Sequence, residues 1–174
     1  MITIREPEVY DKEDILKMVE EFATSDDEIL FDGISNFKSI DDNNYENWLI
    51  EQKDNERFIK RGYSPQTTYI ALDEEGNIVG ALNLRHNLVG DLINHGGNIG
   101  YAIRPSERRK GYASEMLKLA LYECKKLKLD KVLITCRKEN IASSKVIENN
   151  GGICENDYYD EPTKKIYKRY WIKL

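Results

Sequence analysis

The sequence predicts an α/β protein whose central mixed β-sheet carries helices on both faces. Short apolar runs typical of strands alternate with amphipathic segments, and together they give the element order βααβββαβαββ. The chain has 174 residues, of which 40% are hydrophobic and 33% are charged, as in ordinary soluble globular proteins. This length fits one domain with a sizeable core, so we expect residues 1–174 to form a single domain.

The N-terminal segment predicts a strand, a helix and a long loop. Ile2 and Ile4 alternate with polar residues as in a strand, and Asp11 or a neighbour can cap the helix that follows. The apolar face of this helix consists of Ile15, Met18, Val19 and Phe22. Residues 24–44 are mainly polar, and the apolar residues scattered among them favour a loop packed over the core: Phe31, Ile34 and Phe37.

A second helix and a β-hairpin come next. The helix begins near Tyr45, and we expect it to continue towards Ile59 and to end before Pro65. Two strand-like runs, Thr67–Leu72 and Ile78–Leu84, flank an acidic turn that contains glycine and asparagine, which is typical of a hairpin. The glycine-rich residues that follow, 87–97, predict an irregular loop.

The C-terminal part predicts three strands and a short helix. Lys131–Cys136 is apolar enough for a buried strand. Asn140 can cap a helix through Glu148, and the glycines at 151 and 152 end it. The remaining expectations are two closing strands and an acidic loop between them: Ile153–Glu155, Ile166–Leu174 and, for the loop, Asn156–Glu161.

A strand, a basic turn and a helix are predicted between the loop at 87–97 and the C-terminal part. Gly100–Ile103 reads as a strand that Pro105 ends, because proline cannot donate to a ladder. The turn contains Arg108, Arg109, Lys110 and Gly111, and apolar residues then recur at helical spacing from Ala113 to Leu127. The first N–H groups of a helix lack partners inside it, so a glycine-bearing basic turn before them predicts an anion site. The alternative is a solvated basic turn.

The pattern Arg108-x-x-Gly111-x-Ala113 after a strand and before a helix resembles the acyl-CoA signature of the Gcn5-related N-acetyltransferases (GNAT). Gly-Tyr-x-Ile-x-Pro upstream and Asn140 with a short helix downstream are similar to that family as well. The resemblance implies the acyl-CoA N-acyltransferase fold and acetyl-CoA as co-substrate, with no metal. It also implies a set of cofactor-binding residues: main-chain groups of Tyr101, Ala102 and Ile103 for the pantetheine, Arg108, Arg109, Lys110, Gly111, Tyr112, Ala113 and Ser114 for the pyrophosphate, and Asn140, Ser143 and Ser144 nearby.

The catalytic residues depart from the family pattern. Many members have a Glu two residues before the Gly-Tyr pair and a Tyr in the second CoA-proximal helix, whereas this chain has Asn98 and Ile147. Neither residue can transfer a proton. Asn98 could order a water that relays it.

Several other residues are candidates for the missing acid or base. His95 could act as a base near neutral pH, and Asp91 lies in the same loop, although a loop residue of either type is more often simply exposed. The late acidic loop could bind a cationic acceptor or supply an acid, or simply be solvated: Asp157, Tyr158, Tyr159 and Glu161. Cys136 ends a strand, but a covalent acyl-cysteine would need a lowered thiol pKa.

Composition limits the partners. A formal net charge of −5 argues against a general nucleic-acid-binding protein and slightly favours a cationic acceptor. The three cysteines match neither a zinc spacing nor a disulfide framework. The start shows no signal peptide and no apolar run approaches the ~18 residues of a membrane span. We expect a cytoplasmic protein without a membrane or nucleic-acid partner, and a homodimer is compatible with the sequence.

The predicted function is transfer of acetyl from acetyl-CoA to a primary amine of a small molecule or peptide by direct attack in a ternary complex. Three alternatives stay open. The chain could bind CoA with little or no turnover, could use another acyl-CoA or a hydroxyl acceptor, or could be an interaction domain whose basic turn is incidental.

Overall fold

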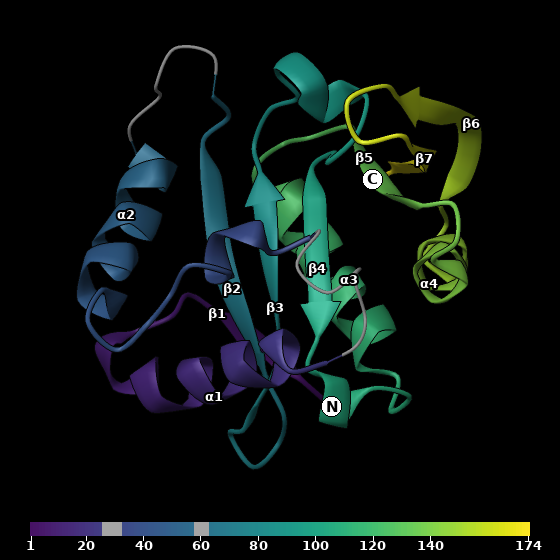
Figure 1. Cartoon of the computed structure of the whole chain (residues 1–174). Coiled ribbons are helices and arrows are strands. Elements are labelled where there is room, and N and C mark those ends of the chain that lie inside the picture. Colours follow the sequence, from purple (N-terminus) through teal and green to yellow (C-terminus); the bar gives the residue numbers. More distant parts are fainter. Residues whose placement is uncertain (26–32, 58–62) are drawn as a thin grey trace.

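The computed structural model describes residues 1–25, 33–57 and 63–174. Within these ranges the helices and strands follow the predicted order βααβββαβαββ, with short 3-10 turns between some of them (Figure 1). Their bounds are β1 Thr3–Arg5, α1 Lys12–Ala23, α2 Tyr45–Arg57, β2 Gln66–Leu72, β3 Ile78–Arg85, β4 Ile99–Ile103, α3 Tyr112–Lys126, β5 Lys131–Arg137, α4 Ile141–Asn149, β6 Ile153–Asp160 and β7 Lys165–Lys173.

The expected α/β architecture with helices on both faces is confirmed, and its central strands are divided between two antiparallel sheets. In the described residues the first sheet has the order β1-β2-β3-β4 and the second the order β5-β7-β6. The two sheets meet where β4 begins. There the main-chain N–H of Asn98 donates to the carbonyl of Leu133 on β5 at 2.7 Å. Beyond this point β4 and β5 are not paired as a ladder, and the divergence creates the space described below.

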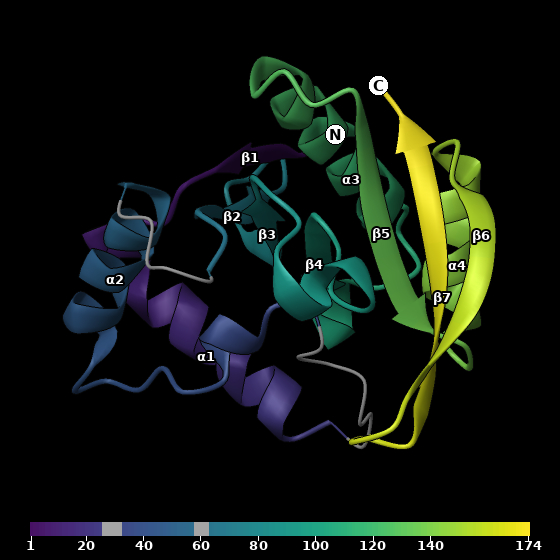
Figure 2. The same ribbon diagram turned by 90° about the horizontal axis from the view of Figure 1, so that it is seen from above.

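Helices cover both faces of the first sheet. α1 and α2 lie on one face, and α3 lies on the other, beside β1, β3 and β4 (Figures 1 and 2). α4 packs beside α3 and β5. Figure 2 shows the second sheet, with β6 at its outer edge, on the opposite side of the molecule from α2.

Two apolar cores hold these layers together. One joins α3 to the sheets and includes Leu82, Met116, Leu117, Val132 and Tyr170, all completely buried. The other lies under α1 and α2, and its buried members include Ile15, Phe22, Ile34, Phe37 and Trp48. Each core buries the apolar helix face that the helical spacing of the sequence predicts.

The loop before α2 packs over the sheet, as its apolar residues predict, since Ile34 and Phe37 are fully buried. Phe31 and Ile59 lie outside the described residues. The expectation of a loop at Asn156–Glu161 was wrong, because β6 continues to Asp160. Cross-strand pairing with β7, including Tyr158 opposite Tyr167, extends the strand through residues whose acidic composition alone favours a loop.

Among the described residues, none of the helices has the length and apolar character needed to cross a membrane.

Candidate functional site

A cavity of about 550 Å³ lies where β4 and β5 diverge, between β4, the turn before α3, and α4. Eleven of the thirteen predicted cofactor-binding residues line it: Tyr101, Ala102, Ile103, Arg108, Arg109, Gly111, Tyr112, Ala113, Ser114, Asn140 and Ser143. Lys110 and Ser144 are not among its lining residues. Glu107, Ala142 and Val146 line it too and were missed, although Ala142 and Val146 are four residues apart and therefore share a helix face.

One end of the cavity is the N-terminus of α3. Gly111 is the N-cap residue, and its φ of 87° is a left-handed conformation that favours glycine. No side chain caps this helix end, so the amides of Gly111, Tyr112 and Ala113 remain available to a ligand in the cavity, whereas that of Ser114 donates to the carbonyl of Gly111. Arg109, with φ 63°, and Arg108 add positive charge on the same turn. Unpaired amides, the helix dipole and two guanidinium groups together favour an anion.

The turn that carries these arginines is tied to α1. Glu21 on α1 accepts a hydrogen bond from the main-chain N–H of Ser106 at 2.8 Å and pairs with the guanidinium of Arg104. Burial raises the pKa of Glu21, but the hydrogen bonds from Ser106 and Arg104 outweigh it and leave the pKa below its usual value. The carboxylate therefore anchors the turn in its charged form.

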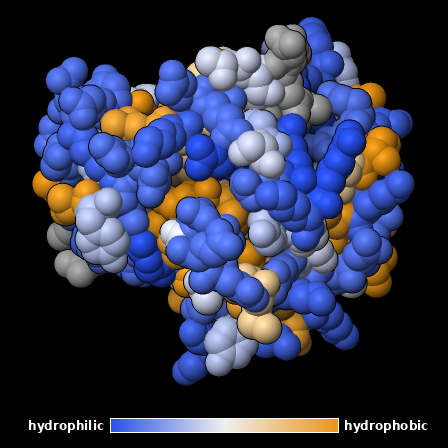
Figure 3. Space-filling model, turned by 90° about the horizontal axis from the view of Figure 1, so that it is seen from below, coloured by the Kyte–Doolittle hydropathy of each residue, from blue (hydrophilic) through white to orange (hydrophobic). Residues whose placement is uncertain are grey.

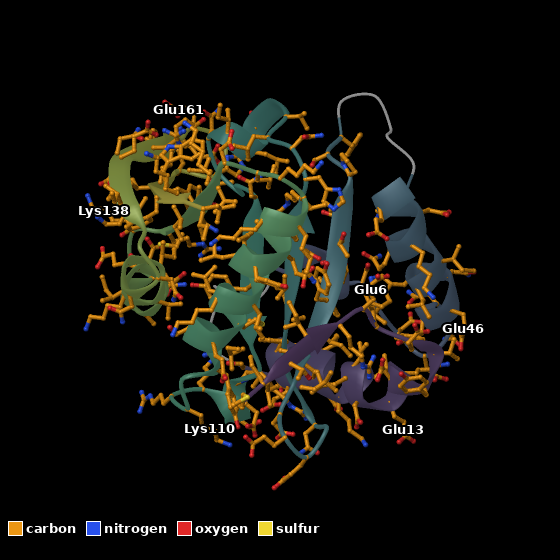
Figure 4. The ribbon with its side chains drawn as sticks, turned by 180° about the vertical axis from the view of Figure 1, so that it is seen from behind. Glu6, Glu13, Glu46, Lys110, Lys138 and Glu161 are labelled. Carbon is orange, nitrogen blue, oxygen red and sulfur yellow. The ribbon has the colours of Figure 1, made fainter. Side chains whose placement is uncertain are left out.

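Lys110 faces away from the cavity. Its ammonium pairs with Glu107 at 2.8 Å, and it lines a second, acidic depression beside the β2–β3 turn. Figure 4 places Lys110 at the lower rim of the molecule, close to the turn before α3. Seen from below, this end of the molecule is mainly polar, with apolar residues gathered in a recess near its middle (Figure 3).

The opposite wall of the cavity is the open edge of β4. Asn98 and Arg104 both bond to β3, since the carbonyl of Asn98 accepts from Arg85 and the N–H of Arg104 donates to Val79. Bonded and non-bonded residues alternate along an antiparallel pair. The N–H and C=O groups of Tyr101 and Ile103 consequently point away from β3 and towards the gap, where the carbonyl of Ile103 also accepts a hydrogen bond from Nε of Arg108 at 3.3 Å. They offer an extended ligand the polar edge of a strand.

Asn140 caps α4 as predicted, because its side-chain oxygen accepts the N–H of Ser143 at 3.0 Å. The hydroxyl of Ser143 in turn lies 3.0 Å from that of Tyr101, which links α4 to β4 across the gap. Burial raises the pKa of Tyr101 well above that of a free tyrosine, so its hydroxyl stays protonated.

Cys136 does not fit a nucleophile. It is buried, and burial raises the pKa of its thiol, the reverse of what an acyl-cysteine requires.

Asn98 lies at the point where the two sheets meet, and its side chain is already bonded. The side-chain oxygen accepts the N–H of Leu133 at 2.9 Å, and the side-chain nitrogen donates to the carbonyl of Arg85 at 3.1 Å. The residue is only 3% exposed. These contacts favour a role in holding β3, β4 and β5 together over the predicted role of ordering a catalytic water.

The other catalytic candidates gather away from the cavity. His95 stacks on Tyr158 and Tyr167, with ring centroids 6.3 and 5.3 Å away, and its Nδ1 lies 3.8 Å from the carboxylate of Asp160. None of these four residues lines the cavity. Asp157 pairs with Lys138 at 2.9 Å, whereas Asp91, Tyr159 and Glu161 are exposed.

The loop before α2 approaches β4 from the other face of the sheet. An added Cβ at Gly33 would lie 2.5 Å from the main-chain nitrogen of Tyr101, so no larger residue fits without a shift. Asn83 on β3 holds this loop by donating to the side-chain oxygen of Asn36 at 2.6 Å. Thr68 and Gln52 complete a buried polar network around them. Sequence reasoning missed this network because its members are far apart in the chain.

Comparison with known proteins adds a family match and three relatives. Residues 2–153 match the family model described as acetyltransferase (GNAT) domain. The uncharacterized N-acetyltransferase YnaD of Bacillus subtilis is 26% identical over 136 residues, which cover 71% of this chain and 78% of that protein.

Two solved structures share the fold. A GNAT-family acetyltransferase from Bacillus anthracis superposes with a TM-score of 0.69 at 24% identity, covering 99% of this chain and 94% of that one. Spermidine N-acetyltransferase from Vibrio cholerae, in complex with CoA and spermine, gives a TM-score of 0.69 at 17% identity, covering 99% and 95%. At these identities the likeness concerns the fold alone.

Proposed function

The chain belongs to the GNAT acetyltransferase family, and we propose that it transfers the acetyl group of acetyl-CoA to the primary amine of a small molecule or peptide. The observation that carries this proposal is the cavity itself. One side of this cavity is the open edge of β4. The other is the N-terminus of α3, which no side chain caps, with Arg108 and Arg109 beside it.

The residues present fit the co-substrate in chemistry as well as in position. Main-chain groups of Tyr101 and Ile103 would pair with the amides of a pantetheine arm, as an added strand does. The amides from Gly111 to Ala113, with Arg108 and Arg109, would hold the pyrophosphate. Gly111 has no heavy atom within 4 Å of an added Cβ, so this turn leaves room for phosphate oxygens.

The reaction we propose is direct attack of a neutral amine on the thioester within a ternary complex. Tyr101 presents a main-chain N–H at the gap that would polarise the thioester carbonyl and stabilise the negative charge on its oxygen. Positioning of two substrates in one site supplies much of the acceleration in such a reaction, since thiolate is a tolerable leaving group. The amine must lose a proton before or during attack.

Several classes of primary amine fit the proposed reaction as acceptor. The net charge of −5 favours a cationic amine, and the V. cholerae relative was solved with spermine. Amino-sugar compounds, amino acids, peptide N-termini and lysine side chains are equally compatible with the chemistry. Measuring thiol release with each of these amines in turn identifies which class the protein acetylates.

Calorimetric titration with acetyl-CoA tests the site, with two matched variants. Gly111→Glu places bulk and negative charge at the proposed pyrophosphate position, and we expect it to abolish binding. Gly76→Glu is the control, because Gly76 has the same φ of 87° and equally open surroundings but lies in the β2–β3 turn outside the cavity. Equal affinity in both variants would refute the assignment of the site.

Two alternative functions make different predictions in the same experiments. A CoA-binding module without turnover would bind acetyl-CoA but release no thiol with any amine. An enzyme for a longer acyl-CoA, or for a hydroxyl acceptor, would show faster thiol release with those substrates than with acetyl-CoA and an amine.

A further inference from the structure

The hydroxyl groups of Tyr101 and Ser143 meet inside the cavity. Their oxygens are 3.0 Å apart, and both residues line the space between β4 and α4. Ser114, another serine on this lining, accepts a hydrogen bond from Asn150 at 3.0 Å. The Tyr101–Ser143 pair is thus a protonated, hydrogen-bonded hydroxyl pair that bridges the two walls of the cavity.

Transfer of an acetyl group from a thioester leaves a thiolate that must be stabilised and then protonated. The position expected for the acid holds Ile147, which is completely buried and has no exchangeable proton. We propose that Tyr101, positioned by Ser143, donates the hydrogen bond and then the proton to the sulfur of CoA. This inference rests on the proposed acetyltransfer, and it identifies the catalytic residue for the leaving group.

The amine nitrogen forms the new bond to the carbonyl carbon, the C–S bond breaks, and its electron pair stays on sulfur. Sulfur takes the Tyr101 proton, Tyr101 takes one from Ser143, and Ser143 takes one from water, so that neither a tyrosinate nor a serine alkoxide is left. The amine proton leaves to water, and the products are an amide and a neutral thiol. A concerted exchange is required, because a tyrosine with a raised pKa is a weaker acid than a thiol of pKa ~8.5.

A series of polar side chains behind Ser143 connects the hydroxyl pair to water. Cys136 contacts Ser143, and its sulfur lies 3.4 Å from the Ser144 hydroxyl oxygen. Ser144 contacts the hydroxyl of Tyr170, which donates to Glu148 at 3.2 Å. Glu148 is exposed, so the series runs from the cavity to a carboxylate in contact with water.

The first test is Tyr101→Phe, with Tyr122→Phe as the matched control on the exposed side of α3. Phenylalanine keeps the ring and leaves the main chain of β4 unchanged, so acetyl-CoA affinity should stay within about twofold of wild type. We expect kcat for thiol release to fall about 100-fold, the usual scale of a lost proton donor. An unchanged kcat, or loss of acetyl-CoA binding in parallel with activity, would overturn the proposal.

A second test addresses Ser143 and includes a rescue. Ser143→Ala removes the hydroxyl partner, whereas Ser143→Thr keeps one on nearly the same atom. Tyr101 and Ser143 should act as one unit, so the double variant should be no slower than Tyr101→Phe alone. If alanine and threonine at 143 reduce kcat equally, or if the two losses add, the serine has no role through its hydroxyl.

A third measurement needs no acceptor. A hydrogen bond to the thiolate favours the charged form and lowers the pKa of the thiol of bound CoA. Titration by the ultraviolet absorbance of the thiolate should give a lower thiol pKa in the wild-type complex than in Tyr101→Phe. Equal values would refute the role of Tyr101, even if acetyl-CoA binding and amine turnover establish the proposed function. Absence of binding or turnover in the wild type would instead refute the proposed function.

Discussion

Gly33 and Gly100 face each other with no room for a side chain on either. A Cβ added at Gly33 would lie 2.5 Å from the nitrogen of Tyr101, and one added at Gly100 would collide with the carbonyl oxygen of Gly33. The loop before α2 is thereby pressed against the same segment of β4 whose N–H points into the gap. Two glycines thus fix the distance between the loop and the proposed thioester position.

We predict that Gly33→Ala lowers kcat/KM for the amine by about 100-fold, because a shift of about 1 Å at a reacting site costs this much. Acetyl-CoA affinity should fall by less than kcat/KM, since Gly33 touches the main chain of Tyr101 but does not itself line the cavity. Ser35→Ala, at an exposed position in the same loop, is the control. Steady-state kinetics with calorimetry checks the prediction, and equal kcat/KM in the two variants would contradict it.

Asn98→Ala should destabilise the fold by about 1–3 kcal/mol, because it leaves buried main-chain groups of Leu133 and Arg85 without their partner. Denaturant unfolding measures this loss. Asn149→Ala, which changes an exposed asparagine at the end of α4, should be neutral by comparison. A variant with wild-type stability but slow turnover would favour the original idea that Asn98 orders a catalytic water.

Asn140→Ala should cost about 1 kcal/mol of stability through loss of the cap on α4. A larger effect on acetyl-CoA affinity than on stability would show that Asn140 also contacts the co-substrate. Asn140→Ser is informative here, because serine caps a helix nearly as well but has no amide. Thermal melts with and without acetyl-CoA distinguish the two roles.

The Glu21 anchor predicts a pH dependence of stability. Its pKa is lowered in the folded state, so its contribution is fully present above the unfolded value near 4.5 and is lost as pH falls through the folded value. Glu21→Gln should therefore be less stable than wild type at neutral pH, and the two should converge once pH falls below the lowered pKa of Glu21 in the folded state. Melting temperatures across this range test the prediction. A stability difference between the two proteins that persists in acid would mean that the ionised carboxylate of Glu21 does not cause it.

Local signals in the sequence predict the core of the site. Pro105 ends a strand, Gly111 starts a helix, and apolar residues keep the helical period after it, so the strand, turn and helix are predictable from neighbouring residues. The cap at Asn140 is local for the same reason. The division of the strands into two sheets cannot be predicted from neighbouring residues, because it depends on how β4 and β5 meet.

Long-range contacts explain what sequence reasoning missed. The end of β6 depends on its pairing with β7, and the Gly33–Gly100 approach joins residues far apart in the chain. The buried pair of Asn36 and Asn83 looks like two ordinary polar residues until the fold brings them together. His95 and Tyr158 do meet, but they meet outside the cavity.

The meeting of the two sheets at Asn98 and Leu133 has a consequence for cooperativity. Past that point the ladder is interrupted, so the β1–β4 half and the β5–β7 half share side-chain packing but few main-chain bonds. A ligand that pairs with the free edge of β4 would act as an eighth strand supplied from outside. At a concentration 100 times its Kd it would stabilise the folded state by about 2.7 kcal/mol. Hydrogen exchange of the Tyr101 and Ile103 amides would then slow to the rate of global opening.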